Sequence, residues 1–527
     1  MKYVELYDTT LRDGSQYEGI SFSVSDKLLV AQALDDLGVD YIEGGWPGSN
    51  PKDAEFFEKA KLVDFKKSTL TAFGSTRRAN IQVQDDSQIQ SLLNAQTSVI
   101  TLVGKSWDLH VEEILETSLE ENLAMISESI SFLVEKCRRV FFDAEHFFDG
   151  YKANRDYSHS VINAAKEAGA ECVILCDTNG GMLPSEIAEI VQEISESHDI
   201  KLGIHTHNDS DTAVAGTIAA VDAGAIHVQG TINGYGERCG NANLVSIIAN
   251  LKLKKGIDCL LDDQLSRLTD VSRIVAEIAN MPAILNQPYV GKSAFAHKGG
   301  LHASAVAKIE ASYQHIPPAL VGNSNRILIS ELSGRRNILM KVEENLGMSI
   351  TKDQAIQLLE KVKEKENQGF QYEGAEASFE LLVKRLDASY RAPFHLVDFM
   401  SIVEERQSVY GSDIEDILSQ VMLKVNVGDE LIHTAATGNG PVNALDHALR
   451  KALLAYYPDL EIVNLVDYKV RVVEEQHGTE AIVRVLLEST DGSQSWTTVG
   501  CSENIIQASW MALSDSMEWW LAGNSHK

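Results

Sequence analysis

Short β-rich runs alternate with longer amphipathic stretches through residues 1–280, and this alternation most constrains what the chain can fold into. It is typical of parallel strands joined by helices. Eight such units in about 250 residues match a closed TIM (β/α)8 barrel. An open doubly wound sheet is the alternative, and the even spacing favours the barrel. The expected strands lie at residues 3–7, 39–43, 69–72, 99–103, 139–142, 172–176, 202–205 and 226–229.

The stretch between the first two strands illustrates the helical pattern. We expect a helix over residues 25–37, with Ser25 as its N-cap and Gly38 as its end. Leu28, Leu29 and Ala33 follow at helical spacing and are expected to form the buried face.

Two further regions follow the barrel pattern. Residues 281–414 are interrupted by prolines and glycines and contain a charged helix near 352–367, so they are expected to form a connector of small helical subdomains. The period changes again in residues 415–527, which we expect to form an α+β domain. Its expected strands lie at 421–427, 432–436, 462–473, 481–487 and 496–499, with helices at 442–456 and 504–520.

Composition bounds the partners and the compartment. Lys and Arg total 46 against 76 for Asp and Glu, and the resulting net charge of −30 argues against nucleic acids and anionic membranes. No apolar run approaches the roughly 18 residues that span a bilayer. The six cysteines form no CxxC pair, and the amino terminus enters a strand pattern directly, so we expect a cytoplasmic enzyme.

Ionisable or amide side chains follow six of the eight expected strands. The active site of a TIM barrel is built at the carboxyl ends of its strands, so these residues are candidates for catalysis. They are Asp8, Arg12, Asp13 and Gln16 after the first strand, Glu43 after the second, Asp143, Glu145 and His146 after the fifth, Asp177 and Thr178 after the sixth, His205 and His207 at the seventh, and Glu237, Arg238 and Asn241 after the eighth.

The histidines at the seventh strand indicate a metal site. Residues i and i+2 of a strand face the same side, so His205 and His207 can converge on one point. Two imidazoles and a carboxylate, here Asp13, form a divalent-metal site that leaves positions open for substrate. Asn241 is a candidate fourth ligand. The alternative is a polar strand end with two unrelated histidines.

Arg12 stands beside the candidate ligand Asp13. A guanidinium next to a metal can stabilise the negative charge that develops on a ketone oxygen when its carbon is attacked. The alternative is a surface ion pair of little energetic value.

Seven motifs resemble the DRE-TIM metallolyase superfamily, and within it the 2-isopropylmalate, homocitrate and citramalate synthases. They sample the chain from end to end. The motifs are DTTLRDGSQ (8–16), IEGGWPGSNP (42–51), CDTNGG (176–181), HTHND (205–209), NGYGERCGNANL (233–244), GGLHASAV (299–306) and GNGPVNALDHAL (438–449).

The resemblance implies roles for these residues. A divalent metal (Mg²⁺, Mn²⁺ or Zn²⁺) would be held by Asp13, His205 and His207, with Asn241 as a further ligand. Arg12 would polarise the keto oxygen of a 2-oxo acid. The other implied substrate-binding residues are Gln16, Glu43 and Thr178, and the other implied catalytic residues are Glu145, His302 and Tyr313. In the family, the residues matching His302 and Tyr313 come from the partner subunit's connector, which implies a homodimer.

The implied reaction joins two small molecules. The methyl group of acetyl-CoA is deprotonated, the enolate attacks the ketone, and the thioester is hydrolysed. GWPGSNPKD after the second strand and GKSWDLHV at 104–111 resemble the citramalate synthases, whose acceptor is pyruvate. The alternatives are a 2-isopropylmalate synthase that uses 2-oxoisovalerate, a lyase of the same superfamily, and a non-catalytic amino-acid sensor.

The carboxy-terminal domain resembles the family's regulatory domain, which binds the end-product amino acid. For a citramalate synthase that effector would be isoleucine. The implied regulatory residues are Gly438, Asn439, Gly440 and Asn443. A purely structural dimerisation domain is the alternative.

Overall fold

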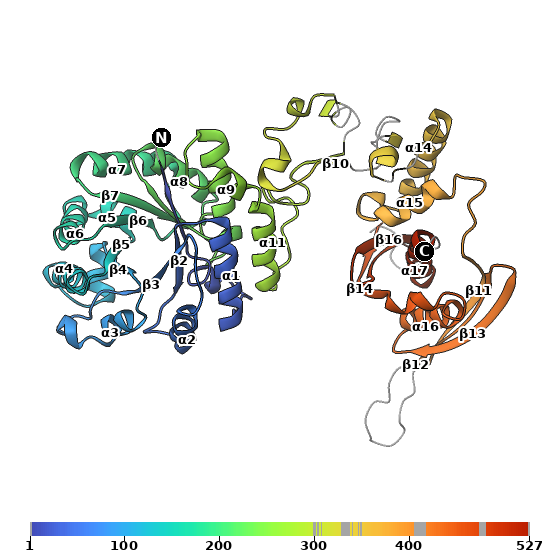
Figure 1. Ribbon diagram of the computed structural model, residues 1–527, viewed down its shortest axis with the longest axis horizontal. Helices are drawn as coiled ribbons and strands as arrows, with labels where there is room; N and C mark the ends of the chain where they lie inside the picture. The colour runs from blue at the N-terminus through green and yellow to red at the C-terminus, as the bar shows by residue number, and fades with distance from the viewer. Residues whose placement is uncertain are drawn as a thin grey trace, which may run out of the picture. The chain divides into compact units, whose positions relative to one another are not determined.

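The computed structural model describes residues 3–298, 302, 305–306, 308–327, 338–339, 341–345, 347, 350–404, 418–473 and 481–524. The chain divides into two compact units (Figure 1). The first comprises Met1–Phe295 with His315–Asn325, and the second comprises Ala296–Gln314 with Arg326–Lys527.

The first unit is a closed parallel barrel, coloured blue to green in Figure 1. Its first strand pairs with both the second and the eighth, which excludes the open doubly wound sheet and confirms the predicted TIM barrel. The strands are β1 (Glu5–Asp8), β2 (Tyr41–Gly45), β3 (Thr69–Ser75), β4 (Val99–Lys105), β5 (Arg139–Glu145), β6 (Cys172–Asp177), β7 (Lys201–Thr206) and β8 (His227–Gly230).

Helices cover the outside of the barrel and bury an apolar layer against the strands, in which Leu34 and Phe56 are fully buried. A smaller cluster fills the barrel itself, where the Tyr41 and Phe141 rings meet edge to face at 5.0 Å. The helices of this unit are α1 (Val24–Leu37), α2 (Pro51–Ala60), α3 (Ser87–Asn94), α4 (Leu119–Glu135), α5 (Phe147–Ala153), α6 (Arg155–Glu167), α7 (Pro184–Ser197), α8 (Ala213–Asp222), α9 (Leu244–Asn250), α10 (Asp262–Leu265) and α11 (Leu268–Ile278).

The N-cap of helix α1 is Ser23, two residues before the predicted cap, so the assignment of Ser25 as N-cap was wrong. The Ser23 side chain accepts a hydrogen bond from the Asp26 backbone N–H, and the Asp26 carboxylate accepts one from Ser23 in return. Gly38 ends the helix in the left-handed region, as predicted. The predicted face was also partly wrong, because Leu29 is 53 % exposed. The residues that α1 buries are Lys27, Val30, Ala31, Leu34, Asp35 and Leu37.

From residue 394 onwards, the described part of the second unit contains the same pattern twice, three antiparallel strands followed by a helix. Helix α16 packs on β12 and β13, and α17 packs on β15 and β16. The elements are β11 (Phe394–Glu404), β12 (Leu418–Val427), β13 (Glu430–Gly438), α16 (Pro441–Leu453), β14 (Asn464–Val472), β15 (Val483–Thr490), β16 (Ser495–Ser502) and α17 (Ile505–Asn524). This confirms the predicted α+β fold, but β11 was not predicted because its side chains do not alternate between buried and exposed.

Four further strands and α-helices described in the second unit precede these sheets along the chain. They are β9 (Ala296–His297), β10 (Arg326–Ile327), α14 (Lys352–Asn367) and α15 (Glu376–Lys384). Helices α14 and α15 confirm that the connector contains helical segments, while the predicted boundaries at residues 280 and 414 stay predictions. Across the described ranges, no helix combines the length and the apolar character needed to cross a membrane.

Candidate active site and metal centre

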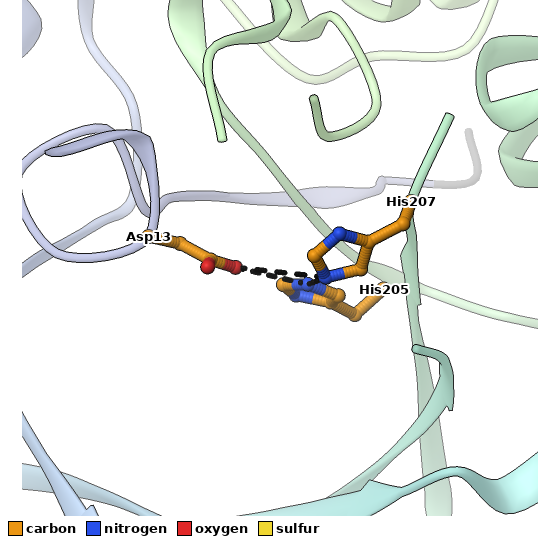
Figure 2. A group of neighbouring side chains, drawn as sticks. All are labelled: Asp13, His205 and His207. Carbon is orange, nitrogen blue, oxygen red and sulfur yellow. Dashed lines mark hydrogen bonds and ion pairs between the residues drawn. The ribbon is translucent and has the colours of Figure 1, made fainter. Parts of the chain in front are cut away.

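His205 and His207 meet at the carboxyl end of β7 (Figure 2). His205 lies within the strand and His207 directly follows it, and their Nε2 atoms are 3.3 Å apart. The two side chains point the same way because alternate residues of an extended segment share a face. The sequence spacing therefore produces the convergence that it predicts.

Asp13 approaches this pair from the loop after β1 (Figure 2). One carboxylate oxygen, Oδ2, lies 3.2 Å from His205 Nε2 and 4.0 Å from His207 Nε2. One ligand atom from each of the three residues lies within 4.8 Å of the others, and all three residues are buried. We call Asp13, His205 and His207 the ligand group.

Asn241 lies beside the ligand group, in the loop after β8. Its Nδ2 lies 2.7 Å from Asp13 Oδ2 and 3.2 Å from His205 Nε2, whereas its buried Oδ1 has no hydrogen-bond partner. A half-turn of the amide would aim Oδ1 at the ligand group. The loop that carries Asn241 requires glycine at Gly236, because a Cβ there would lie 1.8 Å from Oδ1.

A hydrogen-bonded chain fixes the ring of His205 from inside the barrel. The buried amide of Gln229, on β8, has its Oε1 2.7 Å from His205 Nδ1 and donates through Nε2 to Asp143 at 3.0 Å. With the amide oxygen accepting from Nδ1–H, the Nε2 atom is left to face Asp13 and His207. Burial raises the pKa of Asp143 to about 7.

The protonation states of the ligand group suit a cation. Burial, followed by the neighbouring His205, lowers the pKa of His207 to about 4, so its imidazole is neutral near pH 7. Burial alone would raise the pKa of Asp13, but Arg12 and His205 hold that pKa below its usual range. Burial lowers the pKa of His205, yet Asp13 raises it above its ordinary value. A cation would take the place of the proton that Asp13 favours on His205.

The residues present therefore fit a divalent metal. Two imidazole nitrogens and a carboxylate oxygen are the donor set that such ions share in enzymes with open coordination positions. The partnerless Oδ1 of Asn241 and the ring orientation set by Gln229 supply two further observations in favour. The donor set does not separate Mg²⁺, Mn²⁺ and Zn²⁺.

Arg12 is held in place beside the ligand group. Its Nε donates to Glu43 at 2.5 Å, and its Nη1 lies 3.3 Å from Asp13 Oδ1. The guanidinium carbon lies 3.8 Å from the centre of the Phe73 ring. Glu43 has no exposed surface, and Tyr7 donates to its second oxygen at 2.6 Å. Glu43 therefore holds Arg12 in place through this hydrogen bond, and its predicted contact with substrate stays a prediction.

The strand ends enclose a cavity of about 680 Å³, large enough for a small-molecule substrate. Glu145 forms an ion pair with Lys105 at its wall, and the Thr178 hydroxyl accepts a hydrogen bond from the His146 backbone N–H at 2.9 Å. The predicted residues that the cavity brings together are Arg12, Asp13, Gln16, Asp143, Glu145, Thr178, His205, His207, Glu237 and Arg238.

Sequence reasoning missed several residues of this cavity. Polar side chains also follow β3 and β4, the two strand ends that it left out, and Arg77, Arg78 and Lys105 line the wall there. Strand β4 runs to Lys105, past its predicted end at 103, so Lys105 was read as loop. Arg77 and Arg78 lie in the loop after β3, which ends at Ser75 and not at the predicted residue 72. Gln229 was missed because a single glutamine at a strand end carries no spacing signal.

His302 and Tyr313 belong to the second unit, where their rings stack with centres 4.3 Å apart. Both side chains are exposed. Their predicted catalytic role, in which a partner subunit would supply them, stays a prediction.

The predicted regulatory residues lie where β13 gives way to α16. The Asn443 side-chain oxygen accepts a hydrogen bond from the Asn439 backbone N–H at 3.1 Å, and its amide nitrogen lies 3.3 Å from His447 Nε2. A Cβ on Gly438 would lie 2.5 Å from the Asn443 side-chain oxygen, so this close turn requires glycine, and Gly440 is the N-cap of the helix. Their predicted effector contact stays a prediction.

Three protein-family models match successive parts of the chain. The HMGL-like model matches residues 3–275, which include the whole barrel. The homocitrate synthase post-HMGL domain-like model matches residues 289–369. The LeuA allosteric (dimerisation) domain matches residues 373–521.

Curated relatives match over nearly the full length. The (R)-citramalate synthase of Geobacter sulfurreducens is 53% identical over 520 residues, and the alignment covers 98% of each chain. That of Aquifex aeolicus is 53% identical and covers 98% of this chain and 97% of its own. A probable 2-isopropylmalate synthase of Methanopyrus kandleri is 33% identical over 96% of each chain. With its barrel, its ligand group and its two family-matched following domains, the chain belongs to the (R)-citramalate synthase family.

Proposed function

We propose that this chain is a citramalate synthase, which joins the acetyl group of acetyl-CoA to pyruvate and releases citramalate and free CoA. The observation that carries the proposal is the placement of Arg12 directly against the buried ligand group of Asp13, His205 and His207, inside one cavity. The full-length likeness to curated (R)-citramalate synthases supports pyruvate as the acceptor.

The ligand group and Asn241 would hold the divalent ion. When bound, such an ion supplies a Lewis acid for the keto oxygen of the acceptor. The neutral His207 and the ionised Asp13 are ready for this role near pH 7, given the directions of their pKa shifts.

Arg12 stabilises the charge that develops on the acceptor. As the new carbon–carbon bond forms, the keto oxygen gains negative charge and takes up a proton. A guanidinium already fixed by Glu43 and Phe73 meets that charge without reorganisation. Thr178 and Gln16 line the same cavity, where they bind the polar groups of the acceptor, including its carboxylate.

Proton transfer and hydrolysis complete the reaction. A proton leaves the acetyl methyl group before the bond forms, and water then cleaves the thioester into a carboxylate and a thiol. Glu145, one of the carboxylates that line the cavity, serves these transfers beside Lys105. His302 and Tyr313 act from the connector of a partner subunit in a homodimer, an assembly supported by the match to the dimerisation domain.

The carboxy-terminal domain makes the enzyme responsive to isoleucine, the end product of the pathway that citramalate feeds. The match to an allosteric domain supports regulation, and the Gly438–Asn443 turn offers backbone N–H groups for a carboxylate. The six cysteines, none in a disulfide, support work in a reducing cytoplasm.

The acceptor assay tests the proposal directly. We expect thiol release from acetyl-CoA with pyruvate, and its loss when EDTA removes the metal. Reactions with 2-oxoisovalerate and 2-oxoglutarate, and one without acceptor, are the controls. Faster release with 2-oxoisovalerate would instead indicate a 2-isopropylmalate synthase, and no release with any acceptor would contradict a synthase altogether.

Removing one ligand separates metal binding from folding. In His207→Ala we expect bound divalent metal and turnover to be lost, because the ion loses one of its two imidazole donors. Metal content after dialysis, turnover and the circular dichroism spectrum are measured together. His433→Ala, an exposed histidine on β13, is the matched control and should keep both metal and activity. Normal metal content in His207→Ala would refute the ligand assignment.

Substituting Arg12 by lysine tests its electrostatic role. An ammonium cannot keep the directed contact with Glu43 while facing the substrate, so kcat/KM for pyruvate should fall by about 10²–10³-fold. Arg139→Lys is the matched control, since Arg139 binds Glu171 through two nitrogens at the opposite end of β5 and lines no part of the cavity. An unchanged kcat/KM in Arg12→Lys would remove Arg12 from the mechanism.

Isoleucine should lower the initial rate with pyruvate, and Asn443→Ala should raise the concentration needed for half of that effect. The reason is that Asn443 holds the turn before α16 through its contact with the Asn439 N–H. Asn464→Ala, an exposed asparagine at the start of β14, is the control and should respond like the parent. A rate that isoleucine leaves unchanged up to its solubility would exclude it as the effector.

A further inference from the structure

Trp46 is a cavity residue to which the proposed chemistry gives no task. It directly follows β2 and lines the cavity together with Arg12 and Phe73. Its indole meets the Phe73 ring edge to face, with centres 5.4 Å apart. Phe73 also contacts Arg12, whose guanidinium carbon lies 3.8 Å from the centre of the same ring. Apart from the imidazoles, Trp46 and Phe73 are the aromatic side chains of the described cavity lining.

The indole is held from two helices outside the barrel. Its Nε1 donates to Gln88 of α3 at 2.7 Å, and the Trp46 backbone N–H donates to Asp53 of α2 at 2.9 Å. Gln88 also donates to the Gly48 carbonyl at 3.2 Å, which closes the loop after β2 on itself. The position of the ring is therefore set by directed bonds as well as by packing.

A buried ion pair fixes Asp53 in turn. Lys27 of α1 lies 2.5 Å from the Asp53 carboxylate and also donates to the Gly44 carbonyl at 3.1 Å, and both charged residues are almost fully buried. Removing one partner of such a pair leaves an uncompensated buried charge, so the pair resists displacement. Gly45, at φ +146°, has no room for a Cβ because the Asp53 carboxylate would lie 2.4 Å away.

This wall stands beside the group that fixes the acceptor. The carboxylate and keto oxygen of a 2-oxo acid are drawn to Arg12 and the ligand group, which leaves its side chain to meet apolar surface. Trp46 and Phe73 supply apolar surface next to Arg12. Phe73 also supports Arg12, whereas Trp46 has hydrogen bonds to neither Arg12 nor the ligand group.

We propose that Trp46, held by Gln88 and Asp53, limits the size of the acceptor's side chain and so selects pyruvate over branched 2-oxo acids. The inference rests on the proposed function, since it concerns the acceptor of that reaction. Replacing the indole by a methyl group opens space against a wall that cannot collapse, because its partners remain anchored to α1, α2 and α3.

The test compares kcat/KM for 2-oxoisovalerate with kcat/KM for pyruvate in the full chain with bound metal. In Trp46→Ala this ratio should rise by about 10-fold or more, as expected for the fit of one or two carbon groups in an apolar pocket. Gln88→Ala removes the partner of the indole without touching the cavity lining, and should raise the ratio by a smaller factor. Phe132→Ala, a half-buried aromatic residue on α4 that does not line the cavity, is the control and should leave the ratio unchanged.

The rate of the parent chain with pyruvate distinguishes failure of this inference from failure of the proposed function. If the parent releases CoA with pyruvate and Trp46→Ala shows an unchanged ratio, the selection by Trp46 is refuted while the proposed function stands. If the parent does not use pyruvate, the proposed function fails and this inference fails with it. Circular dichroism and metal content establish that each variant folds, and Trp46→Phe, which removes part of the ring and its Nε1 donor, carries the same test should Trp46→Ala not fold.

Discussion

The pairing of β1 with β8 is the contact on which the site depends. It turns a parallel sheet into a ring, and so brings the loop after the first strand beside the ends of the last two. Asp13 reaches His205 only because these strands are neighbours in the closed barrel. In an open sheet with the same sequence order, the carboxylate and the imidazoles would lie at distant positions, and no ligand group would form.

The closed barrel also buries charged side chains away from water, and hydrogen bonds and ion pairs with neighbouring side chains stabilise them. Arg12 lies between two carboxylates, Asp13 and Glu43, so that buried charges of opposite sign are adjacent. The Gln229 amide is hydrogen-bonded to both His205 and Asp143, and it thereby fixes the orientation of the His205 ring. A buried polar group is costly without partners, so the partnerless Oδ1 of Asn241 beside the ligand group supports the proposed metal site.

The sequence predicts the barrel well because strand and helix periods repeat eight times and each error is local. It predicts the ligand group because the i, i+2 spacing of His205 and His207 has one geometric meaning on a strand. Its failures have physical causes. Leu29 fits a helical apolar stripe, yet it is exposed, because the next residues, Val30 and Ala31, face the core instead. The roles of Gln229 and Trp46 arise from contacts with residues far along the chain, which no local pattern encodes.

The separation of the ligands along the chain has a consequence for biosynthesis. Asn241 and Asp13 touch although 228 positions divide them. Contacts between distant segments form late, because the intervening chain must first be ordered. A ribosome must therefore synthesise more than 240 residues before Asp13 and Asn241 can meet. Until the eighth strand has emerged, the nascent chain carries strands without a closed ring, so Asp13 and the two histidines are not yet held together.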